Sequence, residues 1–220
     1  VDVLGLKFGR QRYGLFTDAK GGILDDLMFA NRGDHLFLVV NASCKVQDVA
    51  HLRKHLSDVC DIEELNDRGL IALQGPAAES ALVKLNPEVA AMAFMDVKDV
   101  TLVGAPCIVS RSGYSGEDGY EISVPADKAV ELTKALLADP DVHPIGLGAR
   151  DSLRLEAGLC LYGNDIDTTT TPVAASLEWA VQKVRRTGGA RAGGFPGADV
   201  ILPEFETGSA RRRVGLAPEG

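Results

Sequence analysis

Segments with the apolar periodicity of strands alternate along this chain with segments that have the periodicity of helices, and their order is irregular. A parallel sheet would need repeated strand–helix–strand units, and that regularity is missing here. The pattern therefore predicts an α+β fold with mixed or antiparallel sheets and packed helices. Strands are expected at 13–17, 23–31, 35–40, 70–73, 97–103, 107–110 and 120–124, helices at 46–60, 77–85, 128–137, 148–157 and 174–181, and a glycine-rich surface loop at 187–194.

Composition excludes several classes of protein. Hydrophobic residues make up 45% of the 220 positions and charged residues 25%, which is typical of a globular chain. Charged or glycine- and proline-rich segments interrupt every apolar run before the roughly 18 residues that a membrane helix needs. With 23 basic against 31 acidic residues, the net charge of −8 opposes a polyanionic partner. We expect neither a membrane nor a nucleic acid as partner.

The four cysteines, Cys44, Cys60, Cys107 and Cys160, stand far apart and form no C-x-x-C pair. This spacing argues against a zinc site and against a dense disulfide framework. We therefore expect reduced, mostly buried thiols of an intracellular protein. The first residues carry neither an initiator methionine nor a secretory signal, so the chain is expected to begin inside a longer protein.

The segment 46–60 has the pattern of an amphipathic helix. Val49, Leu52, Leu56 and Val59 recur at three- and four-residue spacing and form one apolar stripe. The charged residues of the segment, among them Asp48, are expected on the opposite face.

Two adjacent acids, Asp25 and Asp26, interrupt an apolar run in the strand expected at 23–31. Because successive side chains of a strand point to opposite faces, one of the two must face inward or into a cleft. A carboxylate in apolar surroundings is costly unless a donor accompanies it, and such acids are enriched at active sites. An edge-strand acid that points at solvent remains the alternative.

The segment 111–121 combines three glycines, two tyrosines and three acids. Flexible backbone, flat aromatic faces and carboxylates that accept paired N–H donors suit a planar heterocycle with amino and amide groups. A turn with solvated acids would have the same composition. In the helix expected at 148–157, Arg150 and Arg154 share one face, where salt bridges to Asp151 and Glu156 are the structural alternative to a binding role.

Short motifs along most of the chain resemble, in order, those of the T-proteins, the aminomethyltransferases of the glycine cleavage system. The resemblance implies a folate-binding fold of the aminomethyltransferase type, with an N-terminal segment and a C-terminal barrel domain missing. The motifs are GGILDDL at 21–27, VVNA at 39–42, LQGP at 73–76, GYSGEDGYEI at 113–122, ARDSLRLEAG at 149–158, LYGNDID at 161–167, TP at 171–172 and RRRVG at 211–215.

The resemblance also implies an activity. An aminomethyl group carried on the lipoyl arm of the H-protein passes to tetrahydrofolate, which releases ammonia and gives 5,10-methylenetetrahydrofolate. Tetrahydrofolate would be the co-substrate and the lipoylated H-protein the partner. Such a protein works in the cytoplasm of a bacterium or in the mitochondrial matrix of a eukaryote.

Site residues are implied by the same resemblance. Asp25 matches the key acidic residue beside the reactive folate nitrogens, where it organises proton transfer and stabilises an iminium-like carbon. Glu121 matches the carboxylate that pairs with pterin N–H groups. The remaining matches line the folate cavity or meet the glutamyl carboxylates of folate: Tyr114, Trp179 and Leu38 in the first group, Arg150 and Arg213 in the second.

The resemblance further implies three parts: 1–45 in a first folate-binding domain, 46–145 as a central ferredoxin-like region, and 146–220 as a return to the first domain that starts a connection to the missing one. Relatives with the same fold include the folate domains of sarcosine and dimethylglycine dehydrogenases, sulfonium demethylases, and a non-catalytic folate-binding protein of iron–sulfur assembly. The run at 159–167 favours the T-protein, and no Lys-Gly-Cys loop of the non-catalytic relative is present.

Positive charge gathers toward the C-terminal end although the chain is acidic overall. Arg185, Arg186, Arg191 and the run 211–213 carry it. Such a segregation could steer an acidic carrier protein, so we expect this end to form part of an H-protein docking surface. A solvated basic face is the alternative.

Overall fold

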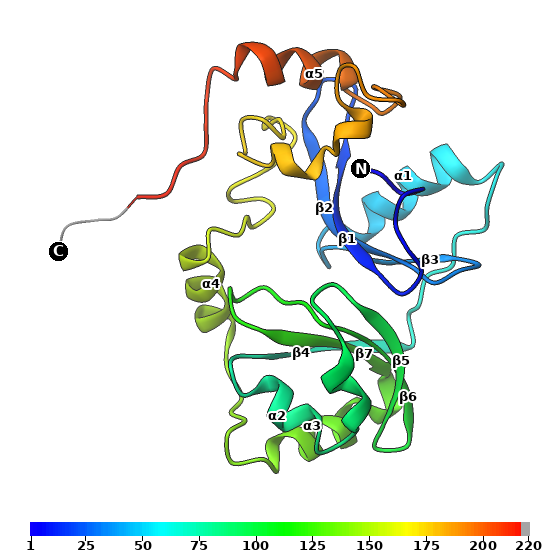
Figure 1. The fold of residues 1–220 in the computed structure, drawn as a ribbon, viewed down its shortest axis with the longest axis vertical. Coiled ribbons are helices and arrows are strands. Elements are labelled where there is room, and N and C mark those ends of the chain that lie inside the picture. Colours follow the sequence, from blue (N-terminus) through cyan, green and yellow to red (C-terminus); the bar gives the residue numbers. More distant parts are fainter. Residues whose placement is uncertain (217–220) are drawn as a thin grey trace. The chain divides into compact units, whose positions relative to one another are not determined.

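The chain forms two compact units in a computed structural model that describes residues 1–216, and each unit is described by itself (Figure 1). Unit 1 comprises 1–8, 12–63 and the chain from Cys160 onward, and unit 2 comprises 9–11 and 64–159. Both combine an antiparallel sheet with helices, which confirms the expected α+β class.

Unit 1 is built on a three-stranded sheet in the order β1-β2-β3, and β2 and β3 pair antiparallel. A tight turn joins the first two strands because the Asp18 carboxylate accepts the backbone N–H groups of Lys20 and Gly22 at 2.8 and 3.0 Å. Gly21 follows the turn with a φ of 83°, which favours glycine. The elements are β1 (Gln11–Thr17), β2 (Ile23–Asn31), β3 (Leu36–Val39), α1 (Lys45–Leu56), η3 (Glu178–Ala180), η4 (Lys183–Arg185) and α5 (Ala198–Thr207).

The core of unit 1 joins the start of β2 to the chain after residue 160. Ile23 is fully buried and packs with Ile166, Ala175 and Leu177, and the sulfur-bearing side chain of Cys160 completes the cluster. Burying these side chains fixes the irregular stretch 160–177 against the strands, since that stretch has few backbone hydrogen bonds of regular structure.

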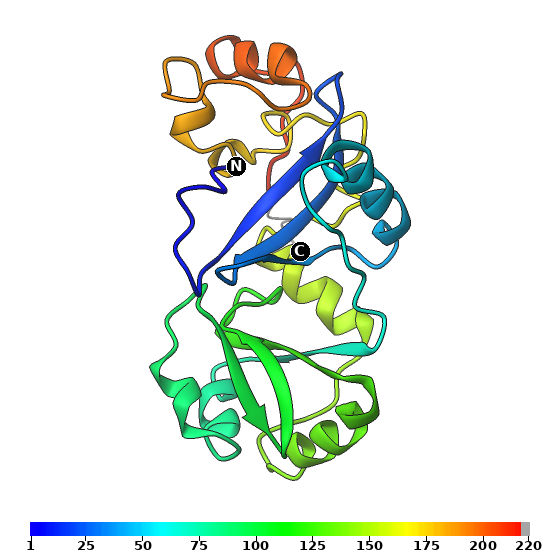
Figure 2. The same ribbon diagram turned by 90° about the vertical axis from the view of Figure 1, so that its right-hand side faces the viewer.

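Helix α1 contradicts the predicted amphipathic stripe. Its buried residue is Asp48, while Leu56 is 37% exposed and Val59 lies beyond the end of the helix. Cys44, directly before α1, and Asp48, one turn later, are buried, so these two side chains lie on the face of α1 that packs against the rest of unit 1. Gln47 fastens the helix to the sheet by donating to the Leu24 carbonyl at 2.8 Å, and Figure 2 shows α1 alongside the strands.

Unit 2 is a four-stranded antiparallel sheet in the order β4-β7-β6-β5. Helices α2 and α3 lie on one side of it (Figure 1), and they bury Leu82 and Leu132 against Val109, Tyr120 and Ile122. The elements are β4 (Arg68–Gln74), α2 (Ala78–Leu82), η1 (Pro87–Ala91), β5 (Val97–Leu102), β6 (Ala105–Ser110), β7 (Gly119–Pro125), η2 (Ala126–Lys128), α3 (Ala129–Leu137) and α4 (Leu147–Glu156).

Two helices differ from the predictions. The segment 174–181 contains only the short turn η3. Ser176 takes a φ of 58°, outside the helical range, and the Leu177 N–H bonds to the Pro172 carbonyl, so the helical turn before η3 ends there. Helix α5 was not predicted, since Pro203 inside it reads as a helix breaker. No helix within residues 1–216 is both long and apolar enough to cross a membrane.

The four cysteines form no disulfide bonds within residues 1–216. Cys44, Cys107 and Cys160 are buried, as expected, whereas Cys60 is exposed just after α1. Burial raises the pKa of the Cys107 thiol, which keeps it neutral.

Candidate functional site

The predicted site residues are divided between the two units. Asp25, Leu38, Trp179 and Arg213 belong to unit 1, whereas Glu121, Tyr114 and Arg150 belong to unit 2.

Asp25 is a buried carboxylate in the middle of β2, with 0% of its surface exposed. It lies on the same face of the strand as the buried Ile23 and Leu27, so the predicted alternation holds. Asn41, just after β3, donates its side-chain N–H to Asp25 Oδ1 at 2.8 Å and its backbone N–H to Oδ2 at 3.2 Å. Two donors on one carboxylate satisfy its buried oxygens and fix its orientation.

Asp26 is not the solvent-facing acid that the sequence analysis kept as an alternative. Its Oδ2 accepts the Tyr13 hydroxyl at 3.0 Å, and its Oδ1 accepts the Asn41 side-chain amide at 2.9 Å. Burial raises the pKa of Asp26, although these two hydrogen bonds favour its charged form. Asn41 therefore joins the neighbouring carboxylates although they leave the strand on opposite faces.

Asp48 is a third acid at this place, and the sequence interpretation missed it. The side chain is 1% exposed, and its Oδ2 has no hydrogen-bond partner within the described part of the chain. Burial first, and then the neighbouring Asp25 carboxylate, raise the pKa of Asp48 to about 8. The only signal in the sequence was that Asp48 stands one helical turn after Cys44, a residue type that is usually buried.

Cys44 and Tyr162 complete the surroundings of Asp25. Burial, followed by contact with Asp25, raises the pKa of the Cys44 thiol to about 11, so the thiol is neutral at physiological pH. Burial also raises the pKa of Tyr162, whose hydroxyl donates to the Ile23 carbonyl at 3.3 Å. No group of three or more histidine, cysteine, aspartate or glutamate side chains within residues 1–216 is arranged to hold a metal ion.

Tyr13 connects Trp179 to the acidic cluster of Asp25, Asp26 and Asp48. The two ring centroids are 5.0 Å apart at an interplanar angle of 34°, and the same Tyr13 binds Asp26. Trp179 keeps 58% of its surface exposed, so its ring can take a further flat partner. Leu38 on β3 is half-buried and opposite Phe29 in the sheet register.

Arg213 is tied to its own unit. Its Nε donates to the Ala175 carbonyl at 2.9 Å, and its backbone N–H donates to the Ala174 carbonyl at 2.7 Å. Ser176 in turn donates its hydroxyl to the Arg213 carbonyl at 2.9 Å. This residue fastens the C-terminal stretch to the turn at 172–177, and its expected contact with a folate carboxylate stays a prediction.

In unit 2, Glu121 stands at the centre of β7, opposite Ser110 on β6 and Ala72 on β4. Ser112 donates its hydroxyl to Glu121 Oε2 at 2.9 Å, and Ser110 and Ser112 are themselves 2.9 Å apart. The sheet and these serines hold the carboxylate in one orientation, with capacity to accept further N–H donors.

Tyr114 and Arg150 come together although they are far apart in the sequence. The Arg150 guanidinium carbon lies 4.6 Å from the centroid of the Tyr114 ring, in a cation–π arrangement. Arg154, one turn further along α4, is instead 4% exposed and bound to the Asp151 carboxylate at 2.7 Å and to the Leu159 carbonyl at 3.2 Å. The scaffolding interpretation is thus confirmed for Arg154.

The loop 111–119 is held by an internal ion pair. Arg111 donates to both oxygens of Asp118, at 3.0 and 2.5 Å, and lies 2.6 Å from a carboxylate oxygen of Glu79. The guanidinium keeps the pKa of the Asp118 carboxyl below its ordinary value. This acid therefore orders the loop that carries Tyr114, in place of a solvated turn.

The basic residues near the C-terminal end are largely engaged in holding the chain together. Arg185 donates to the Gly193 carbonyl at 3.1 Å, and Arg186 donates to the Glu178 carbonyl at 2.8 Å while it covers the Phe205 ring at 4.7 Å. Arg185 thus holds the loop 187–194, and Arg186 links the turn at Glu178 to α5. Docking of a partner at these residues stays a prediction.

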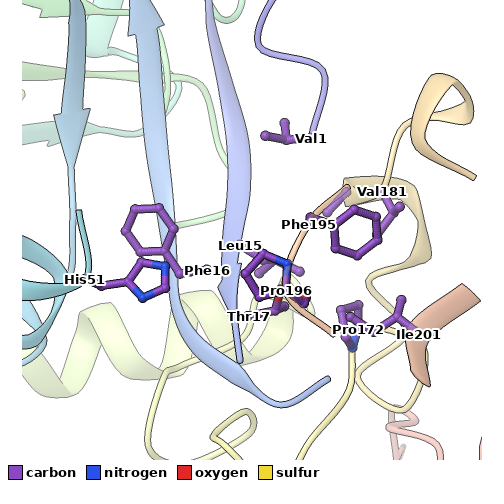
Figure 3. Close-up of a pocket in the computed structure, with 11 residues that line it drawn as sticks. Val1, Leu15, Phe16, Thr17, His51, Pro172, Val181, Phe195, Pro196 and Ile201 are labelled. Atoms are coloured by element: carbon purple, nitrogen blue, oxygen red, sulfur yellow. The ribbon is translucent and has the colours of Figure 1, made fainter. Parts of the chain in front are cut away.

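A small cavity of about 90 Å³ lies elsewhere in unit 1 (Figure 3). His51 and Phe16 stand on one side of it, and Phe195, Pro196 and Ile201 stand on the other. The cavity is well below the roughly 300 Å³ of a typical ligand pocket, and none of the predicted site residues lines it.

Comparison with known proteins gives a consistent family. The family described as the GCVT N-terminal domain matches residues 1–185. A protein named mitochondrial aminomethyltransferase from Dictyostelium discoideum is 43% identical over 237 residues, which cover 100% of this chain and 58% of the relative. Another of that name from Flaveria pringlei is 47% identical over 231 residues, with 100% and 56% covered.

Structural comparison agrees. The crystal structure of glycine cleavage system aminomethyltransferase T from Bartonella henselae matches with a TM-score of 0.86 and 41% identity, over 96% of this chain and 57% of that one. This chain thus spans a little over half the length of these relatives. Since the family match covers most of the chain and the fold agrees, the chain belongs to the GCVT N-terminal domain family, that of the glycine cleavage aminomethyltransferases.

Proposed function

We propose that this chain carries the folate-binding and catalytic residues of an aminomethyltransferase of the glycine cleavage system. The protein transfers the aminomethyl carbon from the lipoyl arm of the H-protein to tetrahydrofolate, and ammonia is released. The observation that carries the proposal is the buried Asp25 carboxylate, which Asn41 holds with two N–H donors inside an apolar strand. A fixed negative charge of this kind stabilises a cation that develops beside it.

Asp25 acts on the reacting carbon and on the folate nitrogens. As the carbon leaves the carrier sulfur, it gains iminium-like positive charge, which the carboxylate stabilises in surroundings with little water. The same carboxylate can accept a proton from a folate nitrogen as the new carbon–nitrogen bond forms. The donors from Asn41 fix the direction of its lone pairs, so little reorganisation is needed during the reaction.

Each unit by itself carries side chains whose chemistry suits folate. Glu121, oriented by Ser112, accepts N–H groups of the pterin, and the ring of Tyr114 offers a flat contact. Trp179 and Leu38 supply apolar contact on the side of Asp25. Arg150, and Arg213 to a lesser degree, would meet the glutamyl carboxylates. The chemistry of these side chains fits a heterocycle joined to a carboxylate tail.

The lipoylated H-protein is the proposed partner. The relatives from Dictyostelium discoideum and Flaveria pringlei are named as mitochondrial enzymes, which supports the mitochondrial matrix as location if the chain comes from a eukaryote, and the cytoplasm stays the expectation for a bacterium. The division into a folate-binding part and a ferredoxin-like part stays a prediction.

The test is an assay of the protein that carries this chain, with aminomethyl-loaded H-protein and tetrahydrofolate as substrates. Formation of methylenetetrahydrofolate and ammonia that depends on both supports the proposal. Turnover of dimethylglycine, sarcosine or a sulfonium compound instead would assign the chain to a related folate-dependent demethylase or dehydrogenase. Folate binding without any transfer would identify a non-catalytic relative.

A further inference from the structure

We propose that Asp48 is a positioning residue for Asp25: it keeps a proton at neutral pH and donates it in a hydrogen bond to the Asp25 carboxylate. The inference rests on the proposed role of Asp25 in the transfer. It adds a residue that holds the reacting carboxylate without touching the substrate.

The first argument is the placement of the two acids. Asp25 on β2 and Asp48 on α1 are both buried, at 0% and 1% exposure. Gln47, the residue before Asp48, donates to the carbonyl of Leu24, the residue before Asp25, at 2.8 Å, so α1 brings Asp48 to the part of β2 that carries Asp25. Two carboxylates in contact and out of water cannot both be charged, because each would lose its hydration and repel the other. One of the pair must therefore carry a proton.

The distribution of donors decides which acid is protonated. Asn41 gives Asp25 one N–H on each oxygen, so both oxygens of that carboxyl group already act as hydrogen-bond acceptors. Asp48 Oδ2 accepts no hydrogen bond within the described chain, although it is fully enclosed. A buried oxygen without a donor fits a neutral carboxyl group, whose O–H needs an acceptor and finds one in Asp25.

The titratable groups around Asp48 agree with this assignment. The negative charges of Asp25 and Asp26 both raise the pKa of Asp48, and the Cys44 thiol one turn earlier is neutral, with a pKa of about 11. The Tyr162 hydroxyl donates to the Ile23 carbonyl at 3.3 Å, and burial raises its pKa as well. The position of Asp48 in the first turn of α1 favours its anion, but this effect is weaker than burial beside a carboxylate. Together these give Asp48 a pKa of about 8.

The proposal has a consequence for the reaction. When Asp48 loses its proton near pH 8, two adjacent carboxylates repel each other and Asp25 moves from its position beside the folate nitrogens. The turnover number should then fall on the alkaline side, while the Michaelis constant for folate changes little because Glu121 and the aromatic rings still bind it. A residue that only supports the fold would give no such fall of the turnover number at alkaline pH, the alkaline limb of the pH profile.

The experiment compares Asp48→Asn and Asp48→Leu in the protein that carries this chain, with Asp58→Asn, an exposed acid just beyond α1, as control. The carboxamide keeps a donor toward Asp25, so Asp48→Asn should retain a turnover within a few-fold of wild type and lose the alkaline limb. Asp48→Leu removes the donor and should lower the turnover about 10- to 100-fold at an unchanged Michaelis constant. An alkaline limb that persists in Asp48→Asn would overturn the proposal.

A second measurement separates this inference from the proposed function. The infrared band of a protonated carboxyl group should be present in wild type at pH 7, disappear as the pH passes about 8, and be missing in Asp48→Asn. If that band is found but no aminomethyl transfer occurs, the proposed function fails and the proton on Asp48 stands. If transfer occurs and the band is absent, the inference about Asp48 fails alone.

Discussion

Asn41 binds Asp25 with two of its own groups, the side-chain amide at 2.8 Å and the backbone N–H at 3.2 Å. A single residue just after β3 thus fixes the direction of the carboxylate in β2. Because the same amide also reaches Asp26, the side chain of Asn41 organises the acid pair as a whole.

Replacing Asp25 by asparagine should lower the turnover number by about two to four orders of magnitude, because the shape is kept while the negative charge and the proton acceptor are lost. The midpoint of thermal unfolding should remain close to that of wild type. Asp34→Asn, at an exposed turn, serves as control. Near wild-type turnover in Asp25→Asn would remove this residue from the catalytic role.

Replacing Glu121 by alanine should weaken tetrahydrofolate binding by about 1.5–3 kcal/mol, the range for hydrogen bonds to a charged group. Isothermal titration calorimetry on a preparation that binds folate measures the change. Glu117→Ala, at an exposed position of the neighbouring loop, should bind folate like wild type. Equal affinities of the two variants would refute the pterin contact.

The stability of the protein should depend on pH through Asp48. Its pKa rises from an ordinary value of 3.8 to about 8 on folding, so the folded state binds more protons than the unfolded state between these two values. Stability therefore falls as the pH rises from about 4 to about 8 and is not regained above that.

Asp48→Asn removes this dependence. Relative to wild type, its free energy of unfolding should be nearly unchanged at about pH 4 and greater by about 1–4 kcal/mol at pH 8. Urea unfolding followed at several pH values measures the difference. If the gap between variant and wild type stays constant with pH, Asp48 does not change its protonation on folding.

Arg150 and Arg154 should respond differently to truncation although they are neighbours on α4. Arg154→Ala leaves the buried pairing site empty and should destabilise the protein by about 1–3 kcal/mol. Arg150→Ala, at an exposed position over Tyr114, should cost under about 1 kcal/mol of stability but weaken the binding of folate with its glutamyl tail. The two contributions separate when unfolding and folate titration are measured on the same variants, and a reversed order would contradict both assignments.

Local patterns predicted much of the fold. Alternating apolar residues located all seven expected strands, and the helices at 78–82, 129–137 and 147–156 appear where periodicity placed them. Alternation along β2 also predicted that one of Asp25 and Asp26 faces inward, because successive side chains point to opposite faces, and Asp25 is the one that does. The ordered motifs further identified the family, which the comparisons confirm.

What surrounds each segment was decided by the tertiary structure. The sequence assigned Asp48 to the polar face of its helix, but the face of α1 that packs on β2 is the one with Cys44 and Asp48. Periodicity shows which residues share one face of a helix, but it does not show which part of the protein that face packs against. The hydrogen bonds of Asn41, the stacking of Trp179 on Tyr13 and the proton proposed on Asp48 all depend on side chains brought together from distant segments, which only packing in three dimensions determines.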